Sequence, residues 1–413
     1  MGDLSIAWRQ ISARWITHGL TVVAISLALA LAVATTLLSR GVQAGIDQAA
    51  GPFGLLIGAK GNAQQLVLST VLLQGAPLGN IGRAIVDRVS KHPGVALAIP
   101  IGQGDSYRRM RIIGTTPEFL ETRTRPAAPP YFRITNGRSF AKPFEAVVGS
   151  AVARRTGLTP GDTFHADHGD EPELPGEDDD DDAHGGNPYT VVGTLAETRS
   201  PADLGIYVAI ESYWEIHAGQ RLTPGDPTGR DAVTAILIVP KAFPADVYRI
   251  QQQALAGVFG PDVQAVVPYQ ELAALNRQVS QAQTVLSAVA IGAMVIAATT
   301  IFLAMYGSVS DRRRDLAILR ALGASRRRIL AIVLIECLVV SALGAIFGVA
   351  GGVAGALGVG SAITDASNVQ VIVQPSLIEP ALAGSMVVLG LLAGLVPATL
   401  GARSDVAGQL API

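Results

Sequence analysis

The residues best suited to chemistry in this sequence lie in one acidic segment, His165 to Gly186, which holds three of the chain's six histidines. Between His165 and His184 there are ten Asp or Glu residues and no Lys or Arg. Imidazole nitrogens and carboxylate oxygens bind borderline cations such as Zn²⁺. His165 and His168 are three residues apart, which suits one chelating turn. One hypothesis is therefore weak Zn²⁺ capture or sensing by His165, Asp167, His168 and His184.

The alternative interpretation of this segment is a solvated run of like charges without a ligand. The segment is rich in Pro and Gly as well as in acid, and this composition is typical of a disordered loop. Like charges that are close in sequence repel one another and keep such a loop extended. The sequence leaves both interpretations open.

Motifs for nucleotide hydrolysis or acyl transfer are missing from the sequence. There is no G-x-x-x-x-G-K-[ST] phosphate loop, and Gly58–Gly61 has the glycines and a lysine but neither the spacing nor the Ser/Thr. There is also no H-E-x-x-H and no G-x-S-x-G. The chain is therefore predicted to be non-catalytic and to bind no cofactor apart from the possible zinc.

The elements that must position these residues are dominated by apolar runs. Only 15% of the 413 residues are charged and the mean hydropathy is +0.39, which argues against an ordinary soluble enzyme, where about 25% are charged. Four runs are long enough to cross a bilayer core of about 30 Å. They cover residues 20–38, 284–306, 329–360 and 381–402. The first is longer than the apolar part of a signal peptide, so we expect a retained helix.

The third apolar run contains one acid, Glu336, next to the chain's single cysteine, Cys337. An ionisable residue inside a membrane is by default a candidate functional site. The favoured interpretation is simpler: Glu336 lies near the membrane surface and pairs with Arg326–Arg328. With one cysteine in a membrane span, the rest of the chain cannot form a disulfide of its own.

The basic residues predict the orientation of the four helices. Arg residues occur in the N-terminal tail (1–19), in the loop 307–328, which has seven, and in the C-terminal tail (403–413). The loop 361–380 has no Lys or Arg. Because Lys and Arg are enriched in cytoplasmic loops, both termini and the loop 307–328 are predicted to be cytoplasmic. Residues 39–283 and 361–380 are then extracytoplasmic.

The large segment 39–283 is predicted to be an α+β domain inserted between helices 1 and 2 of a four-helix transmembrane protein. Short strand candidates alternate with helical patterns, for example Val95–Ile101, Arg108–Gly114 and the helix Ala242–Val258. Strands that begin near Thr163 and at Pro188 are expected to pair, which would place the acidic loop 165–186 at the tip of a hairpin. Residues 42–50 and 270–283 are predicted to continue the first and second membrane helices beyond the membrane.

The cytoplasmic loop carries the most specific pattern in the chain. It reads SDRRRDLAILRALGASRRRI over Ser310–Ile329. Leu316, Leu319 and Leu322 recur at spacing three, which we interpret as an apolar stripe between two groups of arginines, suited to a partner groove or lipid headgroups. Gly323 is predicted to end this short helix.

This layout resembles the MacB/FtsX/LolC-type ABC transporter permeases, the type VII or mechanotransmission family. The loop is similar to the family pattern R-x-x-[DE]-[IL]-x-x-[LM]-[RK]-x-[LI]-G-[AM]. The ending, residues 397–410, and the opening of the large domain, residues 58–68, also look like the family, so the likeness covers essentially the whole chain. It implies ATPase coupling through Arg312, Arg313, Arg314, Asp315, Leu316, Leu319, Arg320, Leu322 and Gly323.

The resemblance further implies a permease in the bacterial inner membrane that works with other chains. Two copies of a cytoplasmic ABC ATPase would carry the ATP and Mg²⁺. A second permease chain, identical or similar, would complete the assembly, and a periplasmic protein is a further possible partner; no nucleic acid is implied. ATP-driven change would pass to the periplasmic domain for export or extraction of a substrate at the outer face of the membrane.

The sequence also allows two alternative functions. One is an FtsX-like transmembrane regulator of a periplasmic enzyme, and the other is a permease tied to zinc or metal homeostasis through the acidic loop. A cell-wall hydrolase bound to the outer domain would favour the first alternative. Metal-dependent expression would favour the second.

Overall fold

The computed structural model describes residues 12–51, 53–123, 128–168, 188–217, 232–367 and 370–403. The chain divides into two compact units. The membrane unit contains the chain up to Gly41, Val279–Ala362 and the residues from Ile372 onward. The outer unit contains Val42–Gln278 and Ile363–Val371.

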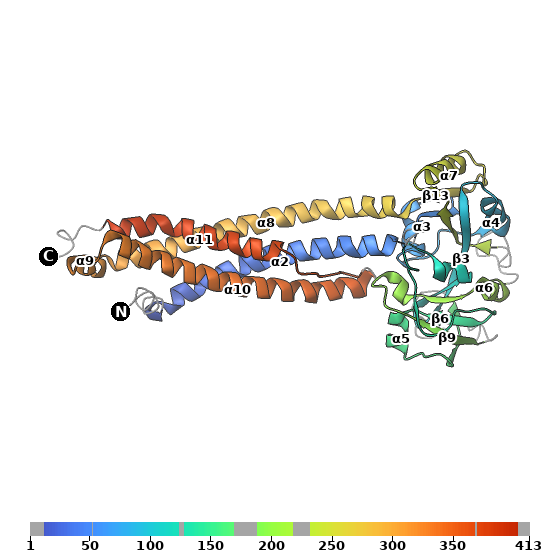
Figure 1. The fold of residues 1–413 in the computed structure, drawn as a ribbon, viewed down its shortest axis with the longest axis horizontal. Coiled ribbons are helices and arrows are strands. Elements are labelled where there is room, and N and C mark those ends of the chain that lie inside the picture. The colour runs from blue at the N-terminus through green and yellow to red at the C-terminus, as the bar shows by residue number, and fades with distance from the viewer. Residues whose placement is uncertain are drawn as a thin grey trace, which may run out of the picture. The chain divides into compact units, whose positions relative to one another are not determined.

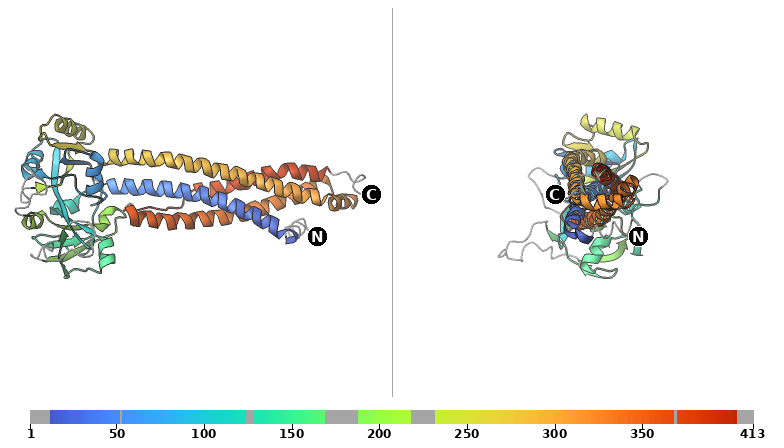
Figure 2. Two further views of the ribbon diagram at one scale, coloured as in Figure 1. Left: turned by 180° about the vertical axis from the view of Figure 1, so that it is seen from behind. Right: turned by 90° about the vertical axis from the view of Figure 1, so that its left-hand side faces the viewer.

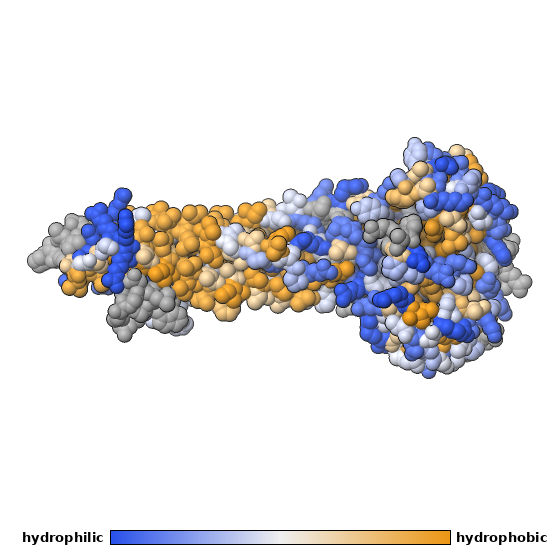
Figure 3. Space-filling view, in the orientation of Figure 1, coloured by the Kyte–Doolittle hydropathy of each residue, from blue (hydrophilic) through white to orange (hydrophobic). Residues whose placement is uncertain are grey.

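In the described part of the chain, the membrane unit contains four long apolar helices and one short helix (Figure 1). They are α2 (Trp15–Ala50), α8 (Pro268–Asp311), α9 (Arg313–Ala321), α10 (Arg326–Ser367) and α11 (Ile378–Ala402). All except the short α9 are long and apolar enough to cross a membrane, which confirms the four predicted spans. Figure 3 shows hydrophobic residues along the surface of these helices. Leu27, Ile296 and Ile346 are each more than 60% exposed. An apolar surface of this extent is suited to lipid.

Glycines allow α10 and α2 to pack closely. Gly344, Gly348 and Gly352 follow one another at spacing four on α10. A methyl group on these glycines would lie 2.5, 2.8 and 2.7 Å from side-chain atoms of Ile25, Leu29 and Val33 of α2. No larger residue fits there without displacing α2, so these glycines set the approach of the two helices, as small residues do in membrane helix pairs.

Two of the long helices extend beyond the membrane unit, as the sequence predicts. Residues 42–50 of α2 and 268–278 of α8 belong to the outer unit. Within that unit, Ile46 and Ala49 of α2 and Leu272 of α8 lie in the main hydrophobic core. The same two helices therefore contribute to the cores of both units.

The outer unit is organised around a mixed sheet with the strand order β13-β1-β12-β3-β4-β10-β6-β9-β5. These strands are β1 (Leu55–Ala59), β3 (Val95–Tyr107), β4 (Met110–Thr115), β5 (Ile134–Gly137), β6 (Glu145–Val148), β9 (Tyr189–Leu195), β10 (Ile206–Ala209), β12 (Ala235–Pro240) and β13 (Val263–Val266). The pairs β4–β10 and β6–β9 are parallel, and the other pairs along this path are antiparallel. The short strands are β2 (Ile81–Gly82), β7 (Thr163–Phe164), β8 (Asp167–His168) and β11 (Ala232–Val233).

Helices cover this sheet and complete the predicted α+β architecture (Figures 1 and 2). They are α3 (Ala63–Thr70), α4 (Arg83–Ser90), α5 (Ser150–Thr156), α6 (Ile210–Ile216) and α7 (Ala245–Leu255), with 3-10 turns at Pro117–Glu121 and Pro201–Leu204. Successive residues of β1 enter different cores: Leu56 joins the cluster with α3, whereas Leu55 and Ile57 join the cluster with α7. Because successive strand residues point to opposite faces, this strand is buried on both sides and its sequence is continuously apolar.

The strands on either side of the acidic loop pair with each other, which confirms the predicted hairpin. Thr163 and Phe164 of β7 lie opposite Thr190 and Tyr189 of β9 in antiparallel register. Further along, β8 pairs with Asp105 and Ser106 of β3 instead. Residues 169–187, which include most of the acid, lie outside the described residues.

Candidate functional site

In the described part of the acidic loop, the predicted zinc ligands do not form a metal site. Of the predicted ligands, His184 lies outside the described residues, and His165 is exposed. The backbone N–H of Arg108 donates to Asp167 Oδ2 at 3.5 Å, and His168 pairs through its backbone with Asp105. Within the ranges that the structure describes, no group of three or more His, Cys, Asp or Glu side chains could hold a metal ion. Zinc binding stays a prediction.

The outer unit holds a buried acid–base pair that the sequence did not reveal. His217 Nε2 lies 3.2 Å from Asp105 Oδ1, and both side chains are 2% exposed or less. His217 Nδ1 lies 2.8 Å from the carbonyl oxygen of Tyr213, which can only accept a hydrogen bond. Burial lowers the pKa of His217, but the Asp105 carboxylate and the Tyr213 carbonyl outweigh it, so the pKa is raised. The pair therefore favours a protonated imidazole.

The predicted coupling segment forms the short helix α9, which ends where the sequence indicates. Gly323 has φ +97°, a conformation that favours glycine. Its N–H donates to the carbonyl of Arg320 at 3.0 Å, and the N–H of Ala324 donates to the carbonyl of Leu319 at 3.0 Å. These two bonds form a Schellman motif. The prediction that Gly323 ends this helix is confirmed.

One face of α9 is packed into the membrane unit. Leu316 and Ala317 are 3% and 0% exposed, and the half-buried Leu319 packs beside them. The cluster around Leu316 contains Val309, Ile329, Val333, Ala398 and Ala402, from α8, α10 and α11. The core of the membrane unit therefore holds this helix in place.

The opposite face of α9 is exposed and apolar at its centre. Ile318 and Leu322 are four residues apart and are 42% and 80% exposed. Arg313, Arg314, Asp315, Arg326, Arg327 and Arg328 are exposed around them, and Arg320 is half-buried. We call Ile318 and Leu322 with these exposed charged residues the α9 face.

The predicted leucine stripe is therefore not one surface. Leu316 is buried and Leu322 is exposed because six residues turn a helix to about 120° short of two full turns. Ile318 is not part of that stripe, although its spacing of four from Leu322 is the stronger sign of a shared helical face.

Arg312 does not belong to the α9 face but to a buried ion pair. Its Nη1 and Nη2 donate to Glu336 Oε1 and Oε2 at 3.1 and 2.9 Å. Its Nε donates to the Ser308 carbonyl at 3.0 Å, and Nη2 also contacts Ser308 Oγ. The Arg312 side chain is 14% exposed and that of Glu336 is 0% exposed. This bidentate contact joins the residue before α9 to Glu336, which lies near the beginning of the apolar helix α10.

The predicted partner of Glu336 was wrong. Arg326–Arg328 precede Glu336 on the same helix by eight to ten residues, which is about 12–15 Å along the axis and out of reach. The cation comes instead from the junction between α8 and α9. At the same end of the unit, Arg14, directly before α2, pairs with Asp311 of α8 at 2.8 Å. Both side chains are partly exposed, at 32% and 61%, and such a pair stabilises little.

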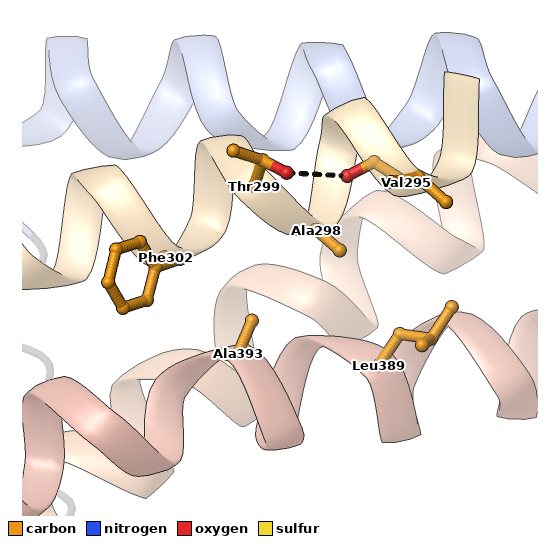
Figure 4. Close-up of a pocket in the computed structure, with 6 residues that line it drawn as sticks. All are labelled: Val295, Ala298, Thr299, Phe302, Leu389 and Ala393. Carbon is orange, nitrogen blue, oxygen red and sulfur yellow. Dashed lines mark hydrogen bonds between the residues drawn. The ribbon is translucent and has the colours of Figure 1, made fainter. Parts of the chain in front are cut away.

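A groove of about 310 Å³ lies between α8 and α11 on the membrane unit (Figure 4). It is lined by Val295, Ala298, Thr299, Phe302, Leu389 and Ala393. The only side-chain hydroxyl in this lining, that of Thr299, donates to the carbonyl of Val295 at 2.9 Å. The lining therefore suits hydrocarbon and not a polar ligand.

Comparison with protein families finds two matches that together cover most of the chain. Residues 19–242 match the MacB-like periplasmic core domain, and residues 287–405 match the FtsX-like permease C-terminal domain. No curated protein matches the chain.

Solved structures similar to this chain include two outer domains. The periplasmic region of MacB from Actinobacillus actinomycetemcomitans matches with a TM-score of 0.34 and 10% identity, over 55% of this chain and 94% of that one. The extracellular domain of the noncanonic ABC-type transporter YknZ from Gram-positive bacteria matches with a TM-score of 0.31 and 10% identity, over 51% and 98%.

Proposed function

This chain belongs to the FtsX-like permeases with a MacB-like periplasmic core domain, and from that premise we propose that it transmits ATP-driven motion to its outer unit. A separate cytoplasmic ABC ATPase, in two copies, binds the ATP and Mg²⁺ and docks on the α9 face. A second permease chain, identical or similar, completes the assembly. The transmitted motion drives export or extraction of a substrate at the outer face of the bacterial inner membrane.

The arrangement of α9 is the observation that carries this proposal. Its inner face is fixed by Leu316 and by the Arg312–Glu336 pair, whereas Ile318 and Leu322 are exposed on the other side. A partner that moves the α9 face therefore also moves α8 and α10. Because residues 268–278 of α8 and 42–50 of α2 pack in the outer unit, the motion has a continuous helical route to the outer unit.

The orientation follows from the arginines and can be tested directly. The native Cys337 is buried, so single cysteines can be introduced in its presence at Lys91 of the outer unit and Ala321 of α9, both exposed. In intact spheroplasts, a membrane-impermeant maleimide is expected to label the K91C variant and not the A321C variant. In inside-out vesicles, A321C is expected to react, and more slowly once the ATPase is bound. Labelling of A321C from the outside would refute the proposed orientation and the docking site with it.

A further inference from the structure

The last residues of α2 in the membrane unit, Arg40 and Gly41, contact the segment that leads into α11. The N–H of Ile372 donates to the carbonyl of Gly41 at 3.1 Å. The next residue of α2, Val42, already belongs to the outer unit. The segment before α11 therefore contacts α2 at Gly41, the last residue of that helix in the membrane unit.

Side chains reinforce this contact. Arg40 Nη1 donates to Ser376 Oγ at 2.6 Å. Ser376 Oγ lies 3.1 Å from both carboxylate oxygens of Glu379, and the Ser376 N–H donates to Glu379 Oε2 at 2.7 Å. Ser376 thus links a guanidinium on α2 to a carboxylate on α11. We call Arg40, Ser376 and Glu379 the outer clamp.

Capping of α11 explains the contacts between Ser376 and Glu379 but not the contact with Arg40. Ser376 and Glu379 have the spacing of a capping box, in which the acid accepts from the backbone of the serine. A cap does not need Arg40, which lies 336 residues earlier in the chain. Glu379 does need a cation, because it is 5% exposed and a buried carboxylate without a counter-charge is costly. The loop 361–380 has no Lys or Arg to provide one.

We propose that the outer clamp is the fixed point about which α2 transmits motion to the outer unit. It holds α2 against the start of α11, while residues 42–50 move with the outer unit in whose core they pack. Gly41 directly follows Arg40 and Gly45 lies one turn further along α2, and glycine in a helix interior weakens the helix relative to alanine. This assignment of Arg40, Ser376 and Glu379 as positioning residues rests on the proposed function.

The test compares R40M and E379Q in the complex with the ABC ATPase, reconstituted in lipid nanodiscs. E379Q keeps an oxygen that can accept from the Ser376 N–H, so the cap on α11 is retained. The readouts are ATP hydrolysis and the change in hydrogen exchange of peptides covering residues 42–50 when ATP and vanadate are added. R249M, which removes an exposed arginine of α7 paired with Asp246, is the matched control.

Both single variants are expected to bind the ATPase and hydrolyse ATP, but to show a nucleotide-dependent exchange change smaller by about fivefold or more. R249M should behave like the wild type. Wild-type exchange changes in both R40M and E379Q would overturn the outer clamp alone. A wild-type complex without any change would overturn the proposed function, and the role of the clamp with it.

Discussion

Replacing Glu336 by alanine is expected to lower the free energy of unfolding of the membrane unit by about 3–5 kcal/mol. The substitution leaves the Arg312 guanidinium without its counter-charge. Because Arg312 is only 14% exposed, water cannot fully replace the two carboxylate oxygens that it loses. R312A should cost a similar amount, because it leaves a fully buried carboxylate. Denaturant-induced unfolding of the purified chain in detergent, followed by tryptophan fluorescence, measures both effects.

The double variant R312M/E336M separates stability from transmission. Apolar side chains of similar length can replace a buried ion pair at little cost, or even stabilise the fold. We therefore expect this variant to regain most of the lost stability, and its ATPase complex to lose nucleotide-dependent change in the outer unit. The exposed Arg14–Asp311 pair provides the control, since R14A should cost less than about 1 kcal/mol. If E336A and R312A were as stable as R14A, the Arg312–Glu336 pair would not be the stabilising buried contact described here.

The second large effect is expected at Leu322. This side chain is 80% exposed, so L322D should leave the fold intact. At the centre of a docking surface, however, the new carboxylate would be desolvated against apolar groups. We expect the ATPase to bind at least about 30-fold more weakly, which corresponds to about 2 kcal/mol or more, the loss typical of a central interface residue.

Leu255 of α7, which is 81% exposed, offers a control with matched chemistry. L255D places the same charge on the outer unit and should leave ATPase affinity unchanged. Affinity is measured by titrating the purified ATPase into the chain held in nanodiscs. If L322D binds as well as L255D does, the α9 face is not the docking site.

Features that depend on local sequence were predicted correctly. The four spans follow from long apolar runs, because a helix must be predominantly apolar along the thickness of a bilayer. Gly323 ends α9 because few other residues adopt its positive φ, and the hairpin of β7 and β9 follows from two strand patterns on either side of a polar loop. Each of these signals lies within about 30 residues of the element that it describes.

Features that depend on distant segments were predicted less well. The partner of Glu336 was sought among the nearest arginines along the chain, but the residue that contacts it, Arg312, lies 24 positions away in the junction between α8 and α9. The parallel pairing of β4 with β10 joins segments about 90 residues apart, which no periodic pattern encodes. Arg40 and Glu379 stand at the ends of apolar runs far apart in the sequence, and the fold brings both of them into contact with Ser376.

The most direct test of transmission is a distance measured within one chain during nucleotide binding. Spin labels on K91C in the outer unit and L377C in the membrane unit, both exposed positions, report how the two units are placed relative to each other. With the ATPase bound, addition of ATP and vanadate is predicted to shift the distance distribution in the otherwise wild-type chain, but not in L322D or R312M/E336M. Identical distributions with and without trapped nucleotide, in a complex that hydrolyses ATP, would contradict the account.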